Sequence, residues 1–146
     1  MPLYWDGLSC SQGIMKQFGD QIYFVFRNFP LDDIHPHVQH AAEASEAAAA
    51  QDKFWQMHDY LFEHQKALDD HHLLEYAQKV GLDIDKFKQE MSGHIYAPLI
   101  NKSLKSGINS GVEGTPTFFI NGERYEDSWD LDTFTSFLKR SFLDKL

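Results

Sequence analysis

The sequence predicts an α/β fold in which a series of helices separates one strand from a final hairpin and helix. Three observations lead to this order: an aromatic and β-branched run at residues 21–30, helical periodicity over residues 33–110, and an Asn-Gly dipeptide between two short strand-like runs. The period of the apolar residues and the turn residues distinguish strands from helices. A chain of 146 residues predicts a single domain over residues 1–146.

The predicted strand is the run QIYFVFRNFP, closed by Pro30. A continuous run of aromatic and β-branched residues is typical of a strand that is buried on both faces, inside a parallel or mixed sheet. We therefore expect residues 21–30 to lie in the core.

The helical region begins with Asp32 and Asp33 as capping candidates, Pro36 near a first turn, and an alanine-rich continuation. In the next segment the apolar residues recur with helical spacing, and this places one set of side chains on a single face: Phe54, Met57, His58, Leu61 and Phe62.

Two more segments repeat this spacing, with the apolar sets Leu73, Leu74, Ala77 and Val80, then Ile84, Phe87 and Met91. Gly81 is predicted to end the first of these helices and Asp83 to cap the second. A fifth helix is expected over residues 96–108.

The period changes again near the end of the chain. Residues 117–120 predict a short strand, Asn121-Gly122 a two-residue turn, and residues 123–126 the returning strand. The last segment is an amphipathic helix whose apolar side chains are Leu131, Phe134, Phe137, Leu138 and Phe142.

Charge and terminal composition limit the function classes. The chain has 22 acidic and 13 basic residues, a net charge of −9, which argues against nucleic acid or an anionic membrane as a partner. The first residues, MPLYWDG, carry no signal peptide. The expected location is therefore cytoplasmic as written, and periplasmic or extracytoplasmic if the N-terminus is truncated.

Several segments together resemble the DsbA-like thiol-disulfide oxidoreductases. They are KQFGDQIYFVFRNFPL (16–31), HPHVQHAAEASEAA (35–48), KFWQMHDYLFEHQ (53–65), GVEGTPTFFING (111–122) and SWDLDTF (128–134). The resemblance covers residues 16–139. It implies a thioredoxin-like fold with a helical subdomain inserted at approximately residues 33–110 and a first core strand that is short or missing.

The resemblance also implies a substrate-binding loop at Thr115 and Pro116. In the family, the bond before this proline is cis, and the backbone of the preceding residue faces the active-site thiol. There it can pair with an extended substrate peptide as an added strand. An X-Pro bond adopts cis at a cost of only about 0.5–1 kcal/mol.

The Cys-x-x-Cys motif of the family is absent, because Cys10 is the only cysteine in the sequence. Two alignments remain open. Without a gap, the motif position falls on residues 1–4, and Cys10 is a small residue within the first helix. With a deletion of about two helical turns, CSQG takes the motif position, Cys10 is the nucleophile, and Gly13 replaces the resolving cysteine.

Two functions from different classes follow. In the first, Cys10 carries a monothiol exchange with an extended peptide, a protein thiol or glutathione, and Thr115 and Pro116 present the substrate. In the second, the chain is a redox-inactive peptide-binding or truncated member of the family. Whether the chain is an enzyme stays open. A shortened central strand would leave a thin core, so we expect a homo-oligomer.

The eight histidines raise the question of a metal site. His37 and His40 have helical spacing and Glu43 follows one turn later, but structural sites use three or four converging ligands. We therefore assign no metal and no cofactor. His58, Trp55 and Trp129 are interpreted as core side chains.

Overall fold

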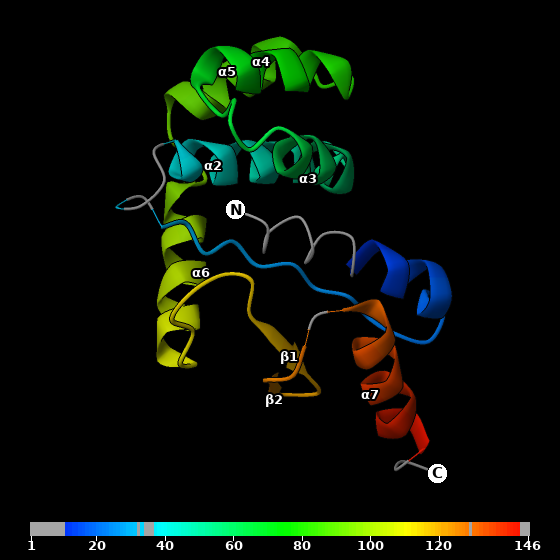
Figure 1. The fold of residues 1–146 in the computed structure, drawn as a ribbon. Coiled ribbons are helices and arrows are strands. Elements are labelled where there is room, and N and C mark those ends of the chain that lie inside the picture. Colours follow the sequence, from blue (N-terminus) through cyan, green and yellow to red (C-terminus); the bar gives the residue numbers. More distant parts are fainter. Residues whose placement is uncertain (1–10, 32, 34–36, 129, 144–146) are drawn as a thin grey trace. The chain divides into compact units, whose positions relative to one another are not determined.

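The computed structural model describes residues 11–31, 33, 37–128 and 130–143. Residues 11–18 are helical. The elements that follow in chain order are α2 (Val38–Ala49), α3 (Phe54–Glu63), α4 (Asp70–Lys79), α5 (Ile84–Ser92), α6 (Ala97–Asn109), β1 (Phe118–Ile120), β2 (Glu123–Tyr125) and α7 (Leu131–Leu143) (Figure 1). Of the helices in this described part, none is long and apolar enough to cross a lipid bilayer.

The chain divides into two compact units. One is continuous and comprises Arg27–Val112, and the other combines both ends of the chain, Met1–Phe26 and Glu113–Leu146. Each unit has its own apolar cluster.

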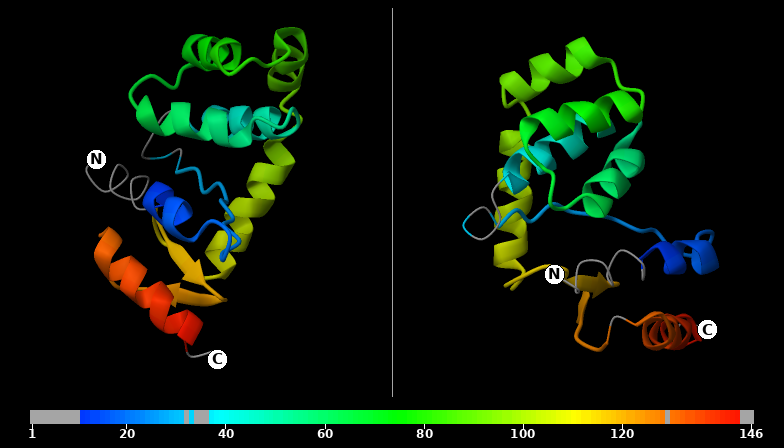
Figure 2. Two further views of the ribbon diagram at one scale, coloured as in Figure 1. Left: turned by 90° about the vertical axis from the view of Figure 1, so that its right-hand side faces the viewer. Right: turned by 45° about the horizontal axis from the view of Figure 1, so that its top comes forward.

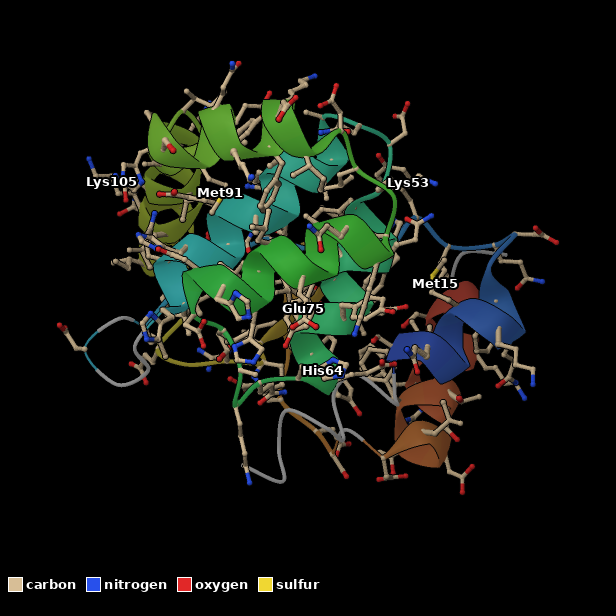
Figure 3. The ribbon with its side chains drawn as sticks, turned by 90° about the horizontal axis from the view of Figure 1, so that it is seen from above. Met15, Lys53, His64, Glu75, Met91 and Lys105 are labelled. Atoms are coloured by element: carbon tan, nitrogen blue, oxygen red, sulfur yellow. The ribbon has the colours of Figure 1, made fainter. Side chains whose placement is uncertain are left out.

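Within the continuous unit, α2 is the central helix and contacts the four other helices of that unit. Figures 2 and 3 show α4 and α5 stacked over α2 and α3. Small side chains allow the neighbours to approach α2 closely, since Ala44, Ala47 and Ala48 are fully buried. Larger buried side chains fill the space around them: Met57, Leu61, Leu73, Tyr76, Leu82 and Phe87.

In this unit the helix caps and stops agree with those predicted from the sequence, with one exception. The carboxylate of Asp83 accepts a hydrogen bond from the Lys86 amide at 3.1 Å, and Gly81 ends α4 with a φ of 84°, as predicted. The start of α2 differs, because its N-cap is His37, with a φ of 70° and no side-chain capping bond. Asp33 therefore does not cap this helix. Asp32 and Pro36 lie outside the described residues.

The second unit is built on the antiparallel pair β1–β2, in which Phe118 lies opposite Tyr125. Asn121 and Gly122 form the turn with φ values of 51° and 86°, the left-handed pair expected of a two-residue hairpin turn. Two helical segments complete the unit, and its buried side chains are Ile14, Phe18, Tyr125, Phe134 and Leu138. The predicted hairpin and closing helix are confirmed.

The prediction of a buried strand at residues 21–30 is wrong. The structure assigns no strand there; Tyr23 is 94% and Val25 57% exposed. Side-chain anchors fix the end of this segment instead, because the Asn28 amide donates to Ser45 Oγ at 3.2 Å and to Glu46 Oε1 at 3.3 Å. An aromatic and β-branched run predicts an extended backbone, but a neighbouring strand is needed to make it part of a sheet.

The aromatic face of α3 confirms one prediction and corrects another. His58 is buried, and its Nδ1 lies 3.0 Å from Asp59 Oδ1. Burial lowers the pKa of His58, although the neighbouring Asp59 opposes this shift, so the ring takes up a proton at a lower pH than a free histidine does. Trp55 is not a core residue, because it is 44% exposed. Trp129 lies outside the described residues.

Candidate functional site

The loop that contains Thr115 and Pro116 directly precedes β1. Its peptide bond between these two residues is cis, the geometry expected from the sequence. The Thr117 hydroxyl donates a hydrogen bond of 2.6 Å to the Gly114 carbonyl, which closes the loop on itself. Thr115 and Pro116 are both half-buried, so part of each residue faces solvent.

The described residues leave space on one side of this loop. A Cβ atom added to Gly114 would meet no heavy atom of the described residues within 4 Å. On the adjacent strand, Phe119 is 43% exposed and pairs across the hairpin with Arg124. An open loop followed by a strand with an exposed aromatic ring is suited to contact with an extended peptide.

The described part of the chain that follows Cys10 is a helix over residues 11–18. Ile14 and Phe18 of this helix are buried in the same cluster as the hairpin. Gly13 faces α7 so closely that a Cβ atom there would lie 2.8 Å from Leu131 Cδ1. The structure thus brings Gly13 against α7, within the same unit as the Thr115–Pro116 loop.

Cys10 itself lies outside the described residues. Its proximity to Pro116 and the state of its thiol therefore stay predictions. The two alignments of the N-terminal segment also stay open.

The residues that have the spacing of metal ligands in the sequence have different surroundings in the structure. His37 is exposed at the start of α2, whereas His40 Nδ1 lies 2.8 Å from Asp70 Oδ1. Glu43 is buried, and its Oε2 lies 3.1 Å from Nδ1 of His94. Sequence reasoning missed His94, because 51 positions separate it from Glu43 and no local pattern connects the two residues.

Comparison with known proteins identifies the family of the chain. A family model described as thioredoxin matches residues 11–140. Similar segments occur in Na(+)/H(+) antiporters: NhaA 3 of Salinispora tropica is 40% identical over 121 residues, which are 83% of this chain and 19% of the antiporter. NhaA of Herminiimonas arsenicoxydans is 39% identical over 137 residues, 94% of this chain and 21% of the antiporter.

A third relative, NhaA 1 of a Mycobacterium species, is 40% identical over 119 residues, 80% of this chain and 19% of the antiporter. The chain thus spans about a fifth of the length of the curated relatives it matches. The thioredoxin match covers the helix at residues 11–18, the hairpin and most of the closing helix. The chain belongs to the thioredoxin family, and it has a thioredoxin-like fold.

Proposed function

We propose that the chain is a DsbA-like thioredoxin-fold domain that exchanges disulfides through a single thiol, Cys10. Thr115 and Pro116 hold an extended peptide or protein substrate beside this thiol. The observation that carries the proposal is the thioredoxin match over residues 11–140, because it spans the loop and the helix that follows Cys10 in sequence. The space that the described residues leave beside Gly114 supports substrate access.

The proposal also concerns the position of the helical subdomain in the chain. The helical subdomain at approximately residues 33–110 is an insertion into the thioredoxin fold, and the division of the chain into Arg27–Val112 and a unit made from both ends supports this.

The proposed reaction is one thiol-disulfide exchange. The Cys10 thiolate attacks one sulfur of a disulfide such as oxidised glutathione, a new disulfide forms to Cys10, and the other sulfur leaves as a thiolate. A second cysteine would normally resolve this mixed disulfide. Since Cys10 is the only cysteine among the 146 residues, the mixed disulfide persists until an external thiol attacks it.

The experiment measures the alkylation rate of Cys10 against pH and its glutathionylation by mass spectrometry. A reactive thiol should have a pKa below the value of about 8.5 for a free cysteine and should add one glutathione per chain. Cys10→Ser should abolish the adduct. An alkylation profile like that of a free or buried thiol, with no adduct, would refute the enzymatic proposal.

Gly13→Cys provides a sharper version of the test. If the gapped alignment is correct, this change recreates a Cys-x-x-Cys motif, and the glutathione adduct should resolve into an internal disulfide. Gly13→Ala is the matched control, since it adds the same Cβ contact with Leu131 without a thiol. A persistent adduct in Gly13→Cys would favour the ungapped alignment.

A second candidate is a redox-inactive binding domain that forms part of a longer protein with a Na(+)/H(+) antiporter. The match to about a fifth of several antiporters favours this candidate. DNA sequence on both sides of the coding segment tests the linkage. Binding of an extended peptide that is equal in the natural chain and in Cys10→Ser would identify a binding domain.

A further inference from the structure

We propose that His40 and His94 together bind one transition-metal ion on the surface of the helical unit. The two residues come from different elements, since His40 lies on α2 and His94 lies in the turn between α5 and α6. Their ring centroids are 5.5 Å apart and the rings are tilted by 41°. This site is independent of Cys10 and of the loop at Pro116.

A carboxylate orients each of the two rings. Nδ1 of His40 lies 2.8 Å from Asp70 Oδ1, and Nδ1 of His94 lies 3.1 Å from Glu43 Oε2. A carboxylate oxygen accepts hydrogen bonds, so this pairing favours the tautomer that has its proton on Nδ1. In the neutral ring Nε2 then has a free lone pair, which is the donor that a metal ion needs. Histidine ligands in metalloproteins are commonly held by a carboxylate in this way.

The carboxylate that bonds to His94 is itself held in place. Glu43 is only 2% exposed, and its second oxygen accepts a hydrogen bond of 3.2 Å from the Gln39 amide. Asp70, the partner of His40, is the first residue of α4, and its side chain is 75% exposed. The ring of His94 is therefore oriented by a buried carboxylate, and the ring of His40 by an exposed one.

The spacing and exposure of the rings fit a shared ion. Two imidazoles on one tetrahedral ion, with metal–nitrogen distances of about 2.0–2.1 Å, have ring centres about 5 Å apart. The side chains of His40 and His94 are 38% and 55% exposed, so an ion can reach them. In the described part of the chain, neither Nε2 has a hydrogen-bond partner.

The donor set also indicates the class of metal. Imidazole nitrogen suits zinc, copper and nickel ions, whereas magnesium and calcium prefer oxygen ligands. Among the described residues, no group of three or more histidine, cysteine or carboxylate side chains is arranged to hold a metal. Water would complete the coordination, and the ion would link α2 to the α5–α6 turn.

The test is a titration of the purified chain with Zn²⁺ alone. Isothermal titration calorimetry measures the binding, and NMR of the imidazole nitrogens identifies the ligands. We expect one ion per chain, with the Nε2 signals of both His40 and His94 shifted. His40→Ala should weaken binding at least tenfold. Asp70→Asn, which leaves both metal ligands in place, should weaken it by about tenfold, as is typical when the carboxylate behind a ligand is lost.

His71→Ala is the matched control. His71 and His72 also have close rings, 5.7 Å apart, but only His72 is bonded to a carboxylate, that of Asp69. Zinc binding should be unchanged in this variant. The proposal is overturned if Zn²⁺ does not bind, if His40→Ala and the natural chain bind it equally, or if the shifted signals belong to His71 and His72. Circular dichroism of each variant excludes unfolding as the cause of a lost signal.

Discussion

Gly107→Ala tests how the extended segment before α2 is attached to the helical unit. Gly107 lies inside α6, and a Cβ atom there would be 2.7 Å from Cδ2 and 2.8 Å from Cε2 of Phe29. Carbon atoms in ordinary contact are about 3.5–4.0 Å apart. The Phe29 ring would therefore have to move by about 1 Å, although Asn28 beside it is hydrogen-bonded to α2.

Two effects of opposite sign decide the result. Replacing a helical glycine by alanine stabilises a helix by about 0.5–1 kcal/mol, whereas overpacking costs about 1–3 kcal/mol. The overpacking term should be larger, so we expect the free energy of unfolding to fall by about 1 kcal/mol. In a Phe29→Ala background the clash is absent, and the same change should instead raise the free energy of unfolding by about 0.5–1 kcal/mol.

Urea denaturation of the four chains in this double-mutant cycle measures both numbers. The change of sign between the two backgrounds is the decisive result, because helix propensity alone has the same sign in both. If Gly107→Ala stabilises the chain that retains Phe29, the close packing of Phe29 on α6 does not exist in solution and the reasoning is refuted.

Three further predictions concern a helix cap, a carboxyl group and assembly. Asp83→Ala should lower the free energy of unfolding by about 1 kcal/mol in urea denaturation, because the Lys86 amide loses its acceptor. Hydrogen bonds from Ser128 and Thr133 lower the pKa of Asp130 to about 2. The ionised carboxylate should therefore stabilise the fold above about pH 4, and this stabilisation should disappear as the pH falls toward 2. In Thr133→Val, NMR titration should show the pKa of Asp130 rising toward its usual value. We also expect the chain to self-associate through the region around residues 1–15 or the sheet edge left by the short first strand, so light scattering should give a mass above that of one chain, whereas a chain that is monomeric at micromolar concentration would contradict this.

The local parts of the fold could be predicted from sequence because their causes are local. Asn121 and Gly122 can adopt left-handed φ values at little cost. The Asp83 carboxylate lies only three residues before the Lys86 amide that it caps. The helix that contains Met57 and Leu61 follows from spacing alone. In each case the interacting groups are close in sequence, so a short pattern contains the information.

Long-range partners could not be predicted in the same way. The run of residues 21–30 has strand composition, but composition does not say whether another strand lies beside it, and Tyr23 is in fact almost fully exposed. The pair of His94 and Glu43 likewise depends on how α2 packs against the α5–α6 turn. A burial pattern indicates which face of an element is covered, and it does not identify the residue that covers it.

Gly13 shows how a sequence comparison and a packing argument can account for the same residue differently. The gapped alignment explains this glycine as the replacement of a resolving cysteine, whereas the structure provides a packing reason, since a Cβ atom would lie 2.8 Å from Leu131 Cδ1. Packing does not by itself require glycine, because the atoms that would be displaced are the flexible end of a leucine side chain that is 40% exposed. A rotamer change of Leu131 can make room at a cost of order 1 kcal/mol. The position can therefore accept a cysteine, and its chemistry can be tested separately from the stability of the fold.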